Sequence, residues 1–89
     1  MIEQDLKIVN RLGLHARPAA LIAQTAAGFQ SDITLTKDGA DVNAKSIMGV
    51  MMLAAEFGST LHLRVEGNDE QAAFDAIKKI FDENFNEEF

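Results

Sequence analysis

Hydrophobic and polar side chains alternate in three stretches of the chain, as they do in β-strands that bury only one face. In residues 5–9 the alternation places Leu6 and Ile8 together on one face of a strand. The same period of two returns in residues 31–37 and in residues 60–66. The pattern therefore predicts three half-buried strands.

An Asp38-Gly39 pair follows the second of these strands and predicts a two-residue hairpin turn. A loop of this length pairs Leu35 with Val42. It also pairs Ile33 with Ala44, two positions further along each strand. Because all four apolar side chains then fall on one face, the hairpin has a register that buries that face. We therefore predict a fourth strand directly after the turn.

Three further stretches carry apolar residues at helical spacing. Residues 16–27 are rich in alanine, and Gly28 after them is typical of a left-handed helix C-cap. Ser46 is a good N-cap for a short helix that runs through about Leu53. A final helix follows Asn68, which stands three residues before a glutamine, the spacing of a capping box.

The predicted order is strand, helix, strand, strand, helix, strand, helix, which indicates the α+β class. We expect an open-faced β-sandwich, in which a four-stranded antiparallel sheet is covered on one face by the two longer helices, with one short helix beside them. A chain of 89 residues predicts a single domain over residues 1–89 with a modest core. So small a domain has little room for a deep active-site cavity, which favours a carrier or binding module over an enzyme.

Composition narrows the classes of function further. A formal net charge of −6 argues against nucleic acid as the main partner. The chain has no cysteine, which excludes disulfides and thiolate metal sites and fits a reducing cytoplasm. No stretch is apolar enough for a signal peptide or a membrane span. We expect a cytoplasmic protein without membrane insertion, cofactor or metal. The acidic residues 82–89 favour a solvated terminus, although this tail, which contains Phe85 and Phe89, could instead fold back on the domain.

The chain has two histidines, and they differ in their surroundings. His62 lies between Leu61 and Leu63 on the polar face of a strand, so we interpret it as a surface histidine without a function. His15 directly precedes the first predicted helix, where backbone N–H groups lack partners and carry a partial positive charge. An imidazole is a nucleophile, and a phosphoryl group on it would be held there as anions are at helix starts.

Arg17 strengthens this interpretation of His15, because its guanidinium is always charged and its donors match phosphate oxygens. A structural role as a helix-capping histidine remains the alternative when these residues are taken alone. The chain has no nucleotide-binding loop and no cluster of metal ligands. If His15 carries a phosphoryl group, partner proteins must therefore supply the donor and the acceptor.

Two motifs favour the phosphoryl carrier. The segment Gly13-Leu14-His15-Ala16-Arg17-Pro18-Ala19 resembles the signature of the HPr family, the histidine-containing phosphocarriers of the phosphoenolpyruvate-dependent sugar phosphotransferase system. A second segment, Lys45-Ser46-Ile47-Met48-Gly49-Val50-Met51, resembles the regulatory serine motif of the same family. The predicted order of elements also agrees, so the resemblance covers essentially the whole chain.

The resemblance implies a role for each matched residue. His15 would receive the phosphoryl group on Nδ1 from enzyme I and pass it to a sugar-specific enzyme IIA domain, so the chain would be a covalent carrier and not an enzyme. Arg17 would stabilise the phosphoryl group, and the backbone N–H groups of Ala16 and Arg17 would help to hold it. Ser46 would be phosphorylated by an ATP-dependent HPr kinase/phosphorylase, in a carbon catabolite regulation that involves a transcription regulator.

An exposed apolar surface beside His15 would suit a carrier that docks to several proteins in turn. The short helix needs only one inward stripe, so its remaining apolar side chains are expected to be exposed. The docking face that the resemblance implies consists of Ala20, Gln24, Ile47, Met48 and Met51. We expect the protein to be a monomer.

Three other interpretations stay open. The chain could be a regulatory binding module that acts only through phosphorylated Ser46, although the presence of both His15 and Arg17 weighs against this. It could serve the nitrogen-regulation branch of the family, which shares the His15 motif, although the intact run around Ser46 favours the sugar branch. It could also be a domain of related fold within a larger assembly.

Overall fold

The computed structural model describes residues 1–87, and the order of its longer elements is the one that the sequence predicts. One element is unexpected, a single turn of 3-10 helix that follows the last α-helix. The elements are β1 (Ile2–Lys7), α1 (Ala16–Ala27), β2 (Asp32–Lys37), β3 (Ala40–Asn43), α2 (Ile47–Met52), β4 (Thr60–Glu66), α3 (Glu70–Asp82) and η1 (Asn84–Asn86).

The four strands form one antiparallel sheet with the order β1-β4-β2-β3. The predicted hairpin register is confirmed: Leu35 is opposite Val42, and the N–H of Ala44 donates to the carbonyl of Ile33 at 2.9 Å. The N–H of Ile8, just past the end of β1, donates to the Ser59 carbonyl at 2.8 Å. The alternation and the turn therefore predicted the strands and the register of the β2–β3 hairpin, whereas the pairing of β4 with β1 and β2 was not predicted.

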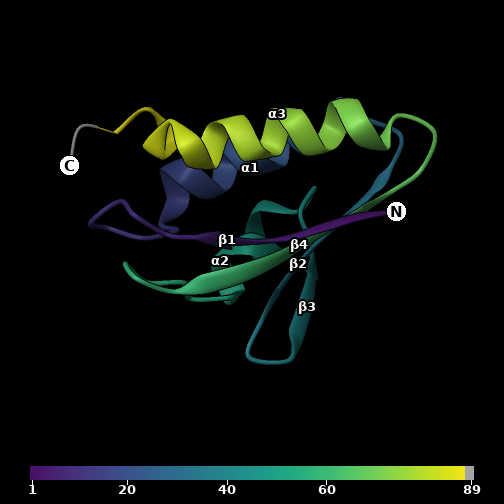
Figure 1. The fold of residues 1–89 in the computed structure, drawn as a ribbon. Coiled ribbons are helices and arrows are strands. Elements are labelled where there is room, and N and C mark those ends of the chain that lie inside the picture. The colour runs from purple at the N-terminus through teal and green to yellow at the C-terminus, as the bar shows by residue number, and fades with distance from the viewer. Residues whose placement is uncertain (88–89) are drawn as a thin grey trace.

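The two longer helices, α1 and α3, lie side by side over one face of the sheet and leave its other face open (Figure 1). The expected open-faced α+β sandwich is thus confirmed. The short helix α2 contacts α1. The core fills the space between the sheet and the helices. Its most buried members are Ile33, Leu35, Leu61, Leu63 and Val65 from the sheet, Ala19, Ile22 and Ala26 from α1, and Ala73 and Ile77 from α3.

Two predicted helix caps are wrong. Gly28 ends α1 in a right-handed conformation with φ −76°, and its N–H donates to the Thr25 carbonyl at 3.2 Å. The last turn of α1 is thus tighter than an α-helical turn, and it gives the Thr25 carbonyl a hydrogen-bond donor without a residue in the left-handed conformation. Asn68 does not cap α3 either, because the N-cap is Asp69, whose side chain caps nothing in the helix. Its carboxylate instead accepts from the N–H of Gln30 at 2.8 Å.

The acidic end of the chain is not the solvated terminus that we expected. Phe85 in η1 is buried and packs edge-on against Phe81, with ring centroids 4.9 Å apart. The side chain of Glu87 is only 4% exposed. Phe89, which belongs to the same expected terminus, lies outside the described residues. The tail up to Glu87 therefore folds back against the body of the protein.

Candidate functional site

His15 ends the loop that joins β1 to α1, and the shape of this loop depends on Gly13. The N–H of Leu14 donates to the Ala55 carbonyl at 2.9 Å, which brings the two backbones together. Gly13 has φ +67°, and a Cβ atom there would lie 3.0 Å from Glu56 Cα and still closer to the Ala55 carbonyl oxygen. Only glycine fits at position 13 while the two backbone segments lie this close together. The resulting shape of the loop places His15 at the start of α1.

His15 is the N-cap residue of α1 through its backbone alone. Its carbonyl accepts from the N–H of Ala19 at 3.0 Å, and its side chain makes no capping hydrogen bond. Within residues 1–87 the N–H groups of Ala16 and Arg17 have no hydrogen-bond partner. The first turn of α1 carries no acidic side chain. The partial positive charge of the helix start is therefore available beside the imidazole, which is 35% exposed.

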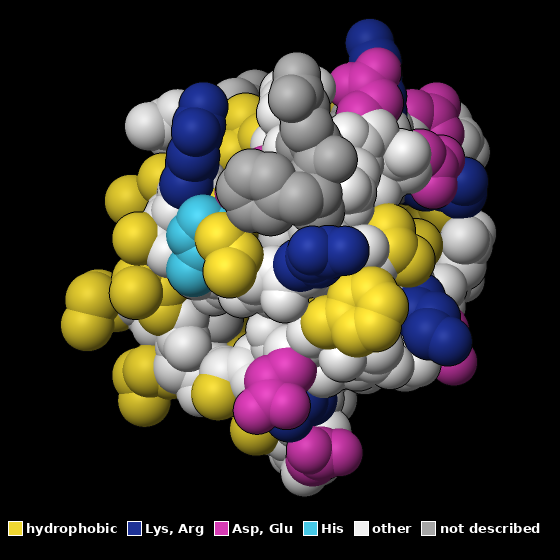
Figure 2. Space-filling model, turned by 90° about the vertical axis from the view of Figure 1, so that its left-hand side faces the viewer, with side chains coloured by type: hydrophobic (Ala, Val, Ile, Leu, Met, Phe, Trp, Pro, Cys, Tyr) yellow, Lys and Arg dark blue, Asp and Glu magenta, His cyan; other side chains and the backbone are white. Residues whose placement is uncertain are grey.

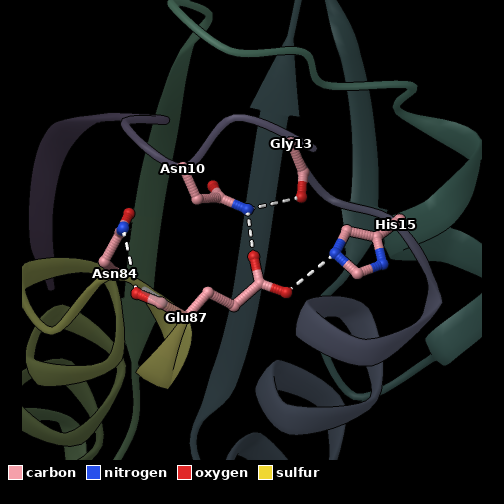
Figure 3. A network of polar contacts seen from close by, with 5 residues as sticks. All are labelled: Asn10, Gly13, His15, Asn84 and Glu87. Carbon is pink, nitrogen blue, oxygen red and sulfur yellow. Dashed lines mark hydrogen bonds and ion pairs between the residues drawn. The ribbon is translucent and has the colours of Figure 1, made fainter. Parts of the chain in front are cut away.

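A carboxylate from the far end of the chain reaches the same imidazole (Figure 3). Glu87 Oε2 lies 2.9 Å from His15 Nε2, and Glu87 Oε1 accepts from Asn10 Nδ2 at 2.8 Å. Asn10 Nδ2 also donates to the Gly13 carbonyl at 2.8 Å. Nδ1 of His15 lies on the side of the ring away from Glu87. Sequence reasoning missed Glu87, since no local pattern connects positions 72 residues apart.

Arg17 faces a different hollow from the one beside His15. Arg17 lines a hollow together with Ala20, Gln24 and Phe85, so the tail is part of its surroundings. Its guanidinium forms no hydrogen bond or ion pair with any residue in the range 1–87. His15 lines the neighbouring hollow with Arg11, a basic residue that the sequence analysis did not single out. Both basic side chains are exposed.

The exposed apolar side chains that we expected on the short helix are present. Ile47, Met48 and Met51 on α2 are all exposed, and Met48 keeps 69% of its surface in contact with solvent. On the face drawn in Figure 2, hydrophobic side chains gather next to a histidine ring. The surface extends further than predicted. Met52, Leu12 and Phe57 are also exposed large hydrophobic residues.

Ser46 is the N-cap of α2, as predicted. Its Oγ accepts from the N–H of Gly49 at 3.0 Å, and the residue is exposed. The local reason is the ordinary preference for a short hydroxyl side chain where the first N–H groups of a helix lack partners. The hydroxyl is therefore structurally occupied and at the same time reachable from solvent.

His62 lies on the open face of the sheet, which confirms its expected surface position. Its Nε2 is 2.9 Å from Glu3 Oε1, and its Nδ1 is 2.8 Å from Asp5 Oδ1. The hydrogen bond to Glu3, followed by that to Asp5, raises the pKa of His62 above its usual value. The strand pairing explains the cluster, because Asp5 stands directly opposite His62 across β1 and β4.

Two other kinds of feature are absent from the part of the chain that the structure describes. Residues 1–87 contain no group of three His, Cys, Asp or Glu side chains placed to hold a metal ion. No helix in the same range is both long and apolar enough to cross a membrane.

Comparison with known proteins gives a consistent result. Residues 2–83 match the family model described as the PTS HPr component phosphorylation site. Phosphocarrier protein HPr of Treponema pallidum is 54% identical over 88 residues, which cover 99% of this chain and 100% of the relative. The HPr-like protein Crh of Halalkalibacterium halodurans is 53% identical over 77 residues, covering 86% of this chain and 92% of the relative.

Solved structures agree with the sequence relatives. The crystal structure of HPr-C-His from Thermoanaerobacter tengcongensis superimposes with a TM-score of 0.95 and 47% identity, covering 100% of both chains. A crystal structure of an HPr dimer from the same organism gives a TM-score of 0.79, covering 98% of this chain and 100% of the other.

Proposed function

The chain belongs to the HPr family of phosphocarrier proteins of the phosphotransferase system, and we propose that it carries its phosphoryl group on Nδ1 of His15. His15 accepts the group from enzyme I, which phosphoenolpyruvate has charged, and passes it to a sugar-specific enzyme IIA domain. One observation carries this proposal: the partly exposed imidazole stands at the start of α1, where the first N–H groups have no partner within residues 1–87.

Phosphoryl transfer needs little covalent chemistry from the carrier beyond one well-placed nucleophile. The lone pair of Nδ1 forms the N–P bond while the bond from phosphorus to the donor breaks, and that electron pair stays with the donor. The N–H groups of Ala16 and Arg17 stabilise the charge on the phosphoryl oxygens, as does the guanidinium of Arg17. The exposed position of Arg17, free of carboxylate partners in residues 1–87, supports this role.

The surface around His15 is suited to partners that dock one after another. We assign docking to Ile47, Met48 and Met51 on α2, together with Ala20 and Gln24 on α1, because the two helices are in contact. Flexible methionine side chains adapt to differently shaped partners. We further propose that the carrier works as a monomer in the cytoplasm. Light scattering at the concentration of the transfer assay tests this, because a monomer gives the mass of one chain and a dimer gives twice that mass.

Ser46 is proposed as the regulatory site of HPr kinase/phosphorylase, with a catabolite-control transcription regulator as a further partner. A phosphate at the N-cap of α2 is favourable for the helix itself, so phosphorylation need not unfold the domain. It places negative charge beside the exposed Ile47 and Met48, where it repels partners with acidic rims. The run of residues around Ser46 supports the sugar branch of the family over the nitrogen branch.

The experiment is a transfer assay with the purified protein, enzyme I and phosphoenolpyruvate, read by intact mass. The wild type gains one acid-labile phosphoryl group. His15→Ala gains none, whereas the matched control His62→Ala, which removes the other histidine, is labelled like the wild type. Labelling that survives His15→Ala contradicts the proposal. A protein that takes only acid-stable phosphate on Ser46, from ATP and the kinase, supports the regulatory binding module instead.

A further inference from the structure

The carboxylate of Glu87 contacts the ring of His15. We propose that Glu87 is a positioning residue, which holds the hydrogen of the His15 ring on Nε2 and so leaves the lone pair of Nδ1 free to attack phosphorus. This inference rests on the proposed function of His15. It concerns a different group, namely a carboxylate that reaches the ring from the other end of the sequence.

The hydrogen bonds around Glu87 determine which ring nitrogen carries the hydrogen. An ionised carboxylate can only accept hydrogen bonds. Glu87 Oε2 lies 2.9 Å from His15 Nε2, so Nε2 must be the donor in this pair. A neutral imidazole carries one hydrogen, which leaves Nδ1 unprotonated. The contact therefore selects the tautomer in which Nδ1 is the nucleophile.

Asn10 fixes the orientation of the carboxylate. Its Nδ2 donates both to the Gly13 carbonyl and to Glu87 Oε1, at 2.8 Å each. If the Asn10 amide were turned over, its carbonyl oxygen would face these two acceptors, so the orientation with two donated hydrogen bonds is the favourable one. Asn10 is completely buried. The same side chain thus holds the loop before His15 and the carboxylate that touches the ring.

The tail is folded in a way that brings Glu87 to this place. The three residues of η1 have φ values of +57°, +57° and +60°, a left-handed conformation that residues other than glycine seldom adopt. Burial of Phe85 against Phe81 anchors this turn. The N–H of Glu87 donates to the Asn84 carbonyl at 3.0 Å, which closes the turn before Glu87. Strain of this kind persists where the surroundings hold it in place, and here it directs a 4% exposed carboxylate onto His15.

The proposed contact serves transfer in both directions. When Nδ1 forms the N–P bond, the hydrogen stays on Nε2, so the ring gains a positive charge and no proton has to leave. The carboxylate of Glu87 stabilises that charge, as the buried carboxylate of a Ser-His-Asp triad stabilises its imidazolium. When the group passes to the next partner, the N–P bond breaks and its electron pair returns to Nδ1. Glu87 therefore keeps His15 ready for the next cycle.

The test compares the ring tautomer, read by ¹⁵N NMR of His15, with the rate of phosphorylation by charged enzyme I. In Glu87→Gln the new amide offers its oxygen to Asn10 and its NH₂ group to Nε2, which favours the hydrogen on Nδ1. We expect the tautomer to invert and the rate to fall by about tenfold, which corresponds to about 1.4 kcal/mol. Glu87→Ala removes the bias without reversing it, so its rate falls less. Glu83→Gln, the same change at an exposed site of the tail, alters neither reading.

Three results would overturn the inference. The first is a wild-type His15 with its hydrogen on Nδ1, which needs no variant and so does not depend on any variant folding. The second is a Glu87→Gln protein with the tautomer and rate of the wild type. The third is faster transfer in Glu87→Ala, which would make Glu87 a cover over the ring. Failure of the proposed function would look different, because the wild type itself would then take no phosphoryl group from enzyme I.

Discussion

Replacing Gly13 by alanine should destabilise the protein more than the same replacement at Gly39. Both glycines have positive φ, +67° at Gly13 and +82° at Gly39. They differ in their surroundings, since a Cβ atom at Gly39 meets nothing within 4 Å. At Gly13 it meets backbone atoms of Ala55 and Glu56, and these cannot rotate away as a side chain could. The pair of variants therefore separates two parts of the loss in stability, the cost of placing alanine at positive φ and the cost of the steric clash.

The expected magnitude follows from the two terms. An alanine at positive φ costs about 1–2 kcal/mol at either site. At Gly13 the backbone must also move away from Ala55, and this breaks the hydrogen bond from the N–H of Leu14. A buried donor left without a partner costs a further 1–3 kcal/mol or so. At about 4–8 °C per kcal/mol for a domain of this size, Gly13→Ala should melt at least about 4 °C below Gly39→Ala.

The assay is thermal and urea unfolding followed by circular dichroism, on the wild type and on both variants. Because the loop through Gly13 places His15, we also expect Gly13→Ala to accept phosphate from enzyme I more slowly than Gly39→Ala. Equal stability of the two variants would refute the reasoning, since the close approach to Ala55 would then have no energetic consequence.

Variants at three further residues test other parts of the structure. Ser46→Ala removes the cap of α2 and should lower the free energy of unfolding in urea by about 1 kcal/mol, whereas Ser46→Asp keeps an acceptor and should stay near the wild type. The pKa of His62 is raised, first by its hydrogen bond to Glu3, so the protonated ring stabilises the folded protein. This stabilisation is fully present below about pH 6.5, and the free energy of unfolding should fall as pH rises through the raised pKa. His62→Gln should remove this fall when unfolding is measured across that pH range. The pKa of Asp69 is lowered, first by the hydrogen bond from the Ser31 hydroxyl, so the ionised carboxylate stabilises the folded protein. This stabilisation is present above the usual pKa of an aspartate and is lost as pH falls through the lowered pKa. Asp69→Asn should lose this dependence on pH when unfolding is measured across acidic pH.

The local patterns of the sequence were sufficient for the elements, their order and the α+β class, but not for the strand order β1-β4-β2-β3. Alternation of apolar residues and the Asp38-Gly39 turn determine both the strands and the hairpin register, because a slip by one residue would expose the buried face. The N-cap at Ser46 was equally predictable, since it depends only on a hydroxyl next to the first turn of a helix. The motif around His15 indicated the helix start at which the imidazole lies.

The features that the sequence did not predict are of two kinds. Some depend on contacts between residues far apart in the sequence, and others are helix ends at which more than one backbone conformation is possible. A glycine after a helix permits a left-handed cap but does not require one, and at Gly28 the chain satisfies its carbonyls with a tight right-handed turn. The acidic composition of the tail suggested solvent exposure. Burial of Phe85 and the contact from Glu87 to Asn10 reverse that expectation, and neither has a local signal.

The central claim is that the phosphoryl group is carried on Nδ1 of His15. NMR of the ¹⁵N-labelled protein, phosphorylated by enzyme I and phosphoenolpyruvate, tests it most directly, because the coupling between ³¹P and ¹⁵N identifies the bonded nitrogen. We predict one phosphoryl group per chain, coupled to Nδ1 of His15, with the ring hydrogen on Nε2 facing Glu87. A phosphoryl group bonded to Nε2 of His15, or to any other residue, would contradict the account.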